Sequence, residues 1–122
     1  FMKSNIIPMQ NGVVKSGEFS FSRRAAKLKA YGEEFELPAK TVEFSDKLDA
    51  VRAEMLTTLK TSDTVRSLKK GIGLFIGEEK AEKLFPNDKI NELDPDEILG
   101  FWSALNYELN RHQREIVAKY SR

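Results

Sequence analysis

The residues that could do chemistry in this chain of 122 amino acids are few and scattered. His112 is the single histidine, and the chain has no cysteine, which excludes thiolate nucleophiles, disulfides and thiolate metal sites. A catalytic histidine needs an orienting carboxylate and a nucleophile, and a metal site needs several ligands at suitable spacing. Near His112 stand Arg111 and Arg114, at the edge of an apolar helical stripe. We therefore interpret His112 as a core-boundary residue and expect no catalytic or metal site.

Two further patterns resemble ligand sites without matching them. Gly71, Gly73 and Gly77 are spaced G-x-G-x-x-x-G, which differs from the dinucleotide fingerprint G-x-G-x-x-G, and no G-x-x-x-x-G-K-[ST] motif occurs. The acidic residues between positions 88 and 97 lack the D-x-[DN]-x-[DN]-G pattern of an EF-hand loop. Helix capping and solvation explain these carboxylates. The sequence therefore indicates no cofactor and favours a protein that is not an enzyme.

Charge is distributed unevenly along the chain. Lys and Arg number 20 and Asp and Glu 19, a formal net charge of +1, yet residues 1–30 alone carry a local charge of +5. We interpret residues 1–24 as a basic, flexible or extended arm and residues 25–122 as a single mostly helical domain. No apolar run reaches the length of a signal-peptide core or a bilayer-spanning helix, so we expect a soluble protein without membrane contact.

The elements that would position a site begin with residues 25–44. Apolar side chains alternate there on either side of Tyr31-Gly32, where glycine favours a turn. The segment predicts a small hairpin or two short extended segments, with Pro38 at an edge or a break. Ser45 then resembles a helix N-cap, and apolar residues recur at steps of three and four as far as Leu59.

Three further helices are predicted from capping signals and periodicity. Ser62 marks the start of one that ends at Gly77, where a left-handed glycine is expected. A short helix follows from Glu78 and stops at Pro86. Residues 94–97, Asp-Pro-Asp-Glu, start a final helix of roughly 25 residues with a capping aspartate and an N1 proline. The predicted fold is mainly α, a small domain of about four helices with a short N-terminal β-hairpin or extended segment.

The aromatic residues of the final helix predict a binding surface, because aromatic side chains are enriched at interfaces. A core of this size does not reach three apolar residues several turns further on, Ile116, Val117 and Tyr120. They must contact a partner chain or stay exposed to solvent. The predicted partner-binding residues are Leu74, Phe75, Phe85, Phe101, Trp102, Leu105 and Leu109. The alternative, in which Phe101 and Trp102 simply fill the core, stays open at this point.

Four patches of sequence carry a resemblance to a known family. They are Tyr-Gly followed by Glu-Phe-Glu-Leu-Pro within 31–38, Val-Glu-Phe-Ser at 42–45, Leu-Phe-Ile-Gly-Glu-Glu-Lys-Ala-Glu-Lys-Leu-Phe at 74–85, and the acid-capped final helix. Together they resemble the tail assembly chaperones of long-tailed, siphovirus-type bacteriophages and prophages. The resemblance implies a protein in the cytoplasm of a bacterial host cell that binds the tape-measure protein, keeps it soluble and helps recruit tail-tube protein. Self-association of the chain is compatible with this function.

A second hypothesis is a small helical DNA-binding regulatory protein. The basic amino-terminal stretch and the successive helices predicted between residues 45 and 76 favour it. However, the second of these helices carries Arg66, Lys69 and Lys70 but few of the Asn or Gln side chains that read bases. Because the overall charge is also near zero, nucleic acid is the less favoured partner.

Overall fold

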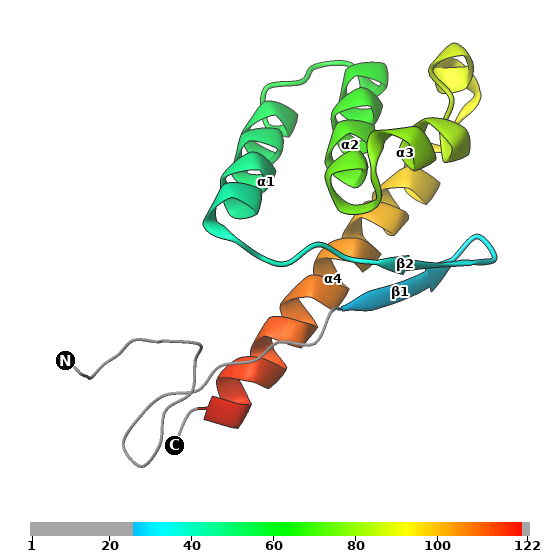
Figure 1. Ribbon diagram of the computed structural model, residues 1–122. Helices are drawn as coiled ribbons and strands as arrows, with labels where there is room; N and C mark the ends of the chain where they lie inside the picture. The colour runs from blue at the N-terminus through cyan, green and yellow to red at the C-terminus, as the bar shows by residue number, and fades with distance from the viewer. Residues whose placement is uncertain (1–25, 121–122) are drawn as a thin grey trace.

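The computed structural model describes residues 26–120, apart from the side chains of Ile116 and Tyr120. The predicted arm over residues 1–24 therefore lies outside the described residues. The described chain forms a mainly helical domain with a short two-stranded hairpin at its amino-terminal side, as the sequence predicted (Figure 1). The elements are β1 Lys27–Ala30, β2 Glu33–Glu36, α1 Val42–Met55, α2 Thr61–Ile76, α3 Glu78–Leu84, the 3₁₀ helix η2 Asn87–Glu92, and α4 Pro95–Tyr120.

The hairpin turns through Tyr31 and Gly32, whose φ angles are 54° and 72°. Two consecutive positive φ angles are typical of a type I′ turn, whose twist matches that of the strands it joins. The strands pair antiparallel, so that Lys27 stands opposite Glu36 with favourable charges. Phe35 of β2 is only 2% exposed and belongs to the core. The turn predicted at Tyr31-Gly32 is confirmed.

α1 begins and ends earlier than the sequence pattern predicted. Its N-cap is Thr41, whose Oγ1 accepts a hydrogen bond from the Phe44 N–H at 3.0 Å. The predicted cap, Ser45, was wrong and lies inside the helix, because the hydroxyl of Thr41 already satisfies a free N–H group of the first turn. The helix also stops four residues short of Leu59, which lies in the connection to α2.

α2 and α3 follow their predicted course with one correction at the start of α2. Lys60 occupies the cap position without a side-chain cap hydrogen bond, and the helix begins at Thr61, so Ser62 is not the cap. Gly77 ends α2 with a φ of 98°, a conformation that glycine adopts without the strain a Cβ would cause. α3 begins at the next residue, and the predicted glycine stop is confirmed.

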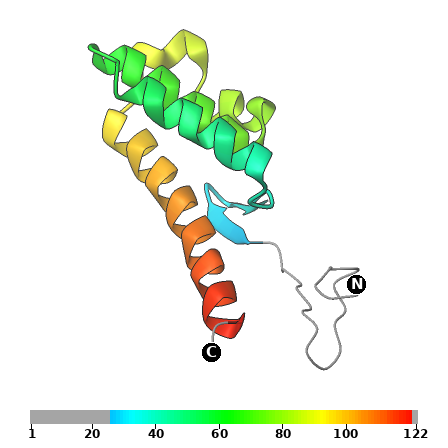
Figure 2. The ribbon, with the colours of Figure 1, turned by 90° about the vertical axis from the view of Figure 1, so that its left-hand side faces the viewer.

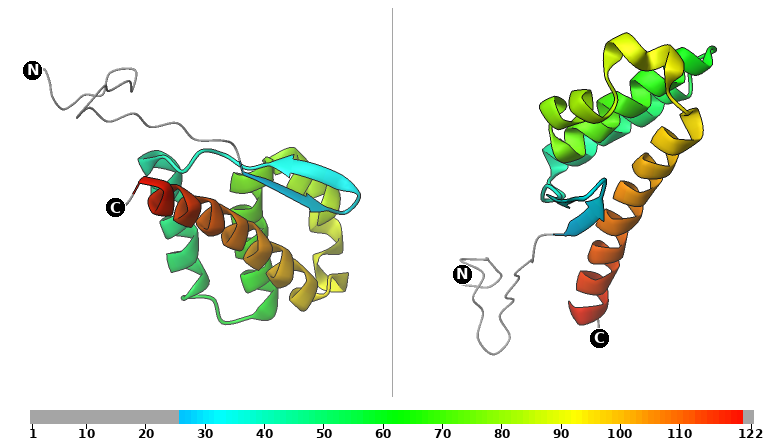
Figure 3. Two further views of the ribbon diagram at one scale, coloured as in Figure 1. Left: turned by 90° about the horizontal axis from the view of Figure 1, so that it is seen from below. Right: turned by 90° about the vertical axis from the view of Figure 1, so that its right-hand side faces the viewer.

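α4 begins at Pro95 as predicted, and Asp94 Oδ1 accepts a hydrogen bond from the Asp96 N–H at 2.9 Å. The helix crosses beneath α1 and α2, with the hairpin along one side (Figure 3). At the crossing Gly71 of α2 lies against Trp102, and a Cβ on Gly71 would be 2.3 Å from the indole Cζ3 atom. The missing side chain of Gly71 therefore lets the two helices approach closely.

A single hydrophobic core joins the hairpin, the four α-helices and η2. Its centre is formed by Leu48 of α1, Ile72 of α2, and Ile98 and Leu105 of α4, each at most 1% exposed. These side chains come from three helices, so each helix is held mainly by packing on the others. The carboxyl-terminal turns of α4 extend past this packed body (Figure 2).

Candidate interaction surface

Six of the seven predicted partner-binding residues lie in the core. Those at most 8% exposed are Phe75, Phe85, Phe101, Trp102, Leu105 and Leu109. Leu74 is partly buried and packs against the same core. Of the two alternatives that the sequence left open, the structure shows the second: these six side chains fill the core and are not at the surface of this fold.

Contacts between aromatic rings explain this burial. Trp102 packs edge-on against Phe75 of α2, with ring centroids 5.9 Å apart. Phe101 contacts Tyr31 of the hairpin turn at 5.2 Å and Phe35 of β2 at 5.9 Å. The hairpin therefore supplies part of the packing around α4, through Tyr31 and Phe35. An apolar period along one helix cannot reveal such partners.

Tyr31 connects the hairpin turn to the first turns of α4 through a hydrogen bond and a ring contact. Its hydroxyl donates a hydrogen bond to Glu97 Oε2 at 3.0 Å, and its ring meets Phe85 and Phe101 edge-on. Burial of the phenol, then the hydrogen bond to Glu97 and the charge of that carboxylate, raise the pKa of Tyr31 to about 12. A non-glycine residue in the left-handed region costs roughly 1 to 2 kcal/mol, and these contacts offset that cost.

Two leucines in the α1–α2 connection are the most exposed large apolar side chains among those that the structure describes. Leu56 is 87% exposed and Leu59 is 98% exposed. A single exposed leucine is ordinary on a protein surface, whereas two in one short turn form a local apolar projection. We call residues 56–59 the leucine turn. Periodicity assigned Leu59 to the core side of a helix, and the structure places it in solvent.

Threonine hydroxyls hold the leucine turn in place. Thr57 Oγ1 donates to the Glu54 carbonyl at 2.8 Å, and Thr58 Oγ1 donates to the Met55 carbonyl at 2.9 Å. The backbone N–H groups of Thr57 and Thr58 bond the same two carbonyls at 3.0 and 3.4 Å, so both carbonyls are satisfied without a further helical turn. The hydroxyls of Thr58 and Thr64 lie 2.7 Å apart and join the turn to α2. The Thr-Thr pair between the two leucines was the sequence signal that could have predicted this turn.

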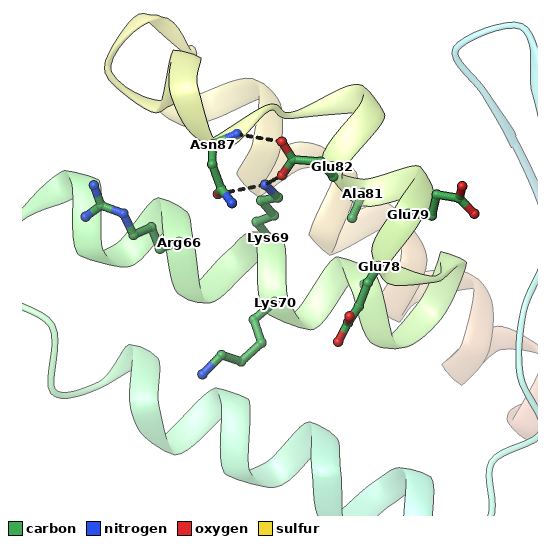
Figure 4. A pocket seen from close by; sticks show the side chains of 9 residues that line it. Arg66, Lys69, Lys70, Glu78, Glu79, Ala81, Glu82 and Asn87 are labelled. Carbon is green, nitrogen blue, oxygen red and sulfur yellow. Dashed lines mark hydrogen bonds and ion pairs between the residues drawn. The ribbon is translucent and has the colours of Figure 1, made fainter.

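A groove of about 580 Å³ lies between α2 and α3 (Figure 4). Lys69 forms an ion pair with Glu82 and donates to Asn87 Oδ1 at 2.8 Å, while the Asn87 N–H donates to Glu82 Oε2 at 3.1 Å. The hydrogen bond from Lys69, followed by that from Asn87, lowers the pKa of Glu82. Lys69, Glu82 and Asn87 thus satisfy one another's hydrogen-bonding groups. We interpret the network as structural, because it connects η2 to α2 and α3.

The cations of α2 are compensated by carboxylates of the protein itself. Arg66 Nη1 lies 3.3 Å from Asp63 Oδ1, and Lys70 Nζ lies 2.9 Å from Glu54 Oε1, while Lys69 is paired in the groove. A helix that docks on DNA needs its cations for phosphate contacts. The geometry of α2 therefore does not favour the DNA-binding hypothesis.

His112 is partly buried on α4, the boundary position that the sequence predicted. Its Nε2 atom is buried and has no hydrogen-bond partner in the part of the chain that the structure describes. Among residues 26–120, no group of three or more His, Asp and Glu side chains is arranged to hold a metal ion.

Val117, predicted to extend beyond the core, is 55% exposed, whereas the side chains of Ile116 and Tyr120 lie outside the described residues.

Comparison with models of known protein families, with curated protein sequences and with solved structures finds no significant match to the chain. Within residues 26–120, no helix has both the length and the apolar character needed to cross a membrane.

Proposed function

We propose that the protein is a tail assembly chaperone of a siphovirus-type phage or prophage that binds the tape-measure protein and keeps it soluble. Two things support the proposal. One is the resemblance of the patches at 31–38, 42–45, 74–85 and the final helix. The other is the leucine turn, an apolar projection that the fold itself does not use. A role in recruiting tail-tube protein is supported by the resemblance alone.

The exposure of Leu56 and Leu59 is the observation that carries the proposal. Burial of an exposed leucine against a partner contributes about 1.5 to 3 kcal/mol. Two leucines on an ordered turn can therefore supply a useful share of the free energy of a weak, reversible complex. A tape-measure protein is expected to present long amphipathic helices, whose apolar stripes match such a projection.

The chaperone surface is thus proposed at a different place from the one the sequence predicted. The aromatic residues of α4 stabilise the fold, and the leucine turn contacts the partner. Weak binding suits a chaperone, because the tape-measure protein must be released when tail-tube subunits assemble around it.

The test is co-expression of the chain with the tape-measure protein of the same phage or prophage. Wild-type protein should keep the tape-measure protein in the soluble fraction, whereas Leu56→Ser/Leu59→Ser should leave it in the pellet. Both leucines are exposed, so the double variant should change the free energy of unfolding by less than about 0.5 kcal/mol per site. Circular dichroism on the purified variant checks that it is folded.

A matched control is Val42→Ser, which removes another exposed apolar side chain, 80% exposed at the start of α1. This variant should retain wild-type activity, because it leaves the leucine turn intact. If the double leucine variant solubilises the tape-measure protein as well as wild type does, the leucine turn is not the binding surface.

A further inference from the structure

The side of α4 that points away from the core carries an ordered row of exposed residues. Their spacing alternates between four and three, an average of 3.5 residues that keeps them in one stripe along the helix. α4 lies at the margin of the molecule in Figure 2 and in the right-hand view of Figure 3. The members of this outer stripe are Asp96, Gly100, Ser103, Tyr107, Asn110 and Arg114, all exposed.

The outer stripe is charged only at its two ends. Asp96 and Arg114 are 18 residues apart, which at 3.6 residues per turn is five full turns, so both point in the same direction. The four residues between them are uncharged. Within residues 26–120, no carboxylate pairs with Arg114 and no cation pairs with Asp96. An acidic end and a basic end are thus both available to a partner.

The stripe is also symmetric about position 105. Against an antiparallel second copy, Asp96 stands opposite Arg114 at both ends of the contact. Gly100 stands opposite Asn110, and Ser103 stands opposite Tyr107, so each larger side chain meets a small one. A parallel second copy would instead bring Asp96 against Asp96 and Arg114 against Arg114, which like-charge repulsion disfavours.

We propose that two copies of the chain pair through the outer stripes of α4 as an antiparallel, twofold-symmetric dimer. Such self-complementary interfaces are the commonest in homo-oligomers. α2 packs over the amino-terminal part of α4, and α1 and α3 pack against α2, so the two bodies lie at opposite ends of the helix pair (Figure 2). A contact of one helix pair is small, below about 1,200 Å², which is the size range of weak, transient interfaces. The dimer is independent of the proposed tape-measure binding, which uses the leucine turn.

Analytical ultracentrifugation of the full chain, from micromolar to millimolar concentration, tests the dimer. Asp96→Arg and Arg114→Asp each place two like-charge pairs in the interface and should weaken the dimer about tenfold or more. An equimolar mixture of these two variants has opposite charges at both ends and should form a heterodimer. The double variant Asp96→Arg/Arg114→Asp should likewise regain wild-type affinity.

The matched control is Glu79→Arg, which makes the same charge change at the second position of α3, outside the outer stripe. This variant should dimerise as wild type does. A chain that stays monomeric at millimolar concentration overturns the proposal. So does a wild-type dimer that Asp96→Arg leaves intact, or a loss of dimer that neither the mixture nor the double variant restores.

Discussion

The close crossing of α2 and α4 predicts opposite effects for two glycine substitutions in the same helix. A Cβ on Gly71 would lie 2.3 Å from Cζ3, 2.8 Å from Cη2 and 3.0 Å from Cε3 of Trp102. Since carbon atoms in contact prefer about 3.5 Å, the indole would have to move by about 1.2 Å. It packs against Phe75 and is only 8% exposed, so it has little room to do so.

The magnitude follows from two opposing effects. Alanine is favoured over glycine in a helix by about 1 kcal/mol, whereas overpacking a core costs about 1 to 3 kcal/mol. With three ring atoms in the way, we expect Gly71→Ala to lower the free energy of unfolding by about 2 kcal/mol. At Gly73 the nearest atoms to a new Cβ are 3.6 to 3.9 Å away, an ordinary contact. Gly73→Ala should therefore raise stability by up to about 1 kcal/mol.

Urea denaturation followed by far-ultraviolet circular dichroism measures both changes. The two variants should move the midpoint in opposite directions. In a Trp102→Phe background, which shortens the ring, Gly71→Ala should cost less than about 1 kcal/mol, because the clashing atoms are gone. Equal shifts for Gly71→Ala and Gly73→Ala, or no rescue by Trp102→Phe, would refute the close crossing.

Two further predictions concern pH. The pKa of Tyr31 is raised from 10.0 to about 12, so between these values the unfolded chain loses a proton that the folded protein keeps, and stability falls as pH rises. Tyr31→Phe should lose less stability than wild type across that window in urea titrations, and an identical alkaline loss would contradict the raised pKa that burial and the Glu97 contact give Tyr31. The pKa of Glu82 is lowered from 4.5 by Lys69, so its contribution is present above pH 4.5 and is lost as pH falls through the lower folded value. Glu82→Gln should show a shallower acid loss than wild type, and unchanged acid sensitivity would contradict the lowered pKa that Lys69 and Asn87 give Glu82.

Local signals in the sequence predicted local structure well. The Tyr31-Gly32 turn, the stop at Gly77 and the start of α4 at Pro95 each depend on a few neighbouring residues, and all three are confirmed. The exact cap is harder to predict, because several residues near a helix start have suitable side chains. Thr41 is the N-cap of α1, and Ser45 lies inside the helix.

The distinction between core and surface could not be predicted in the same way. Periodicity places Trp102 on the apolar face of a helix but does not show what lies opposite that face. Opposite Trp102 lie Gly71 and Phe75 of α2, and opposite Phe101 lies the hairpin residue Phe35, all of them distant from α4 in sequence. The prediction for Leu59 was wrong for a different reason. The apolar period continues to Leu59, but the helix ends at Met55, where threonine hydroxyls bond the last carbonyls.

The central claim is that this chain binds and solubilises a tape-measure protein. The most direct measurement is the fraction of that protein found in the supernatant when it is expressed with and without the full chain. The proposed function predicts a largely soluble tape-measure protein that co-purifies with the chain. A tape-measure protein that is equally insoluble with and without the chain, with no complex recovered, would contradict it.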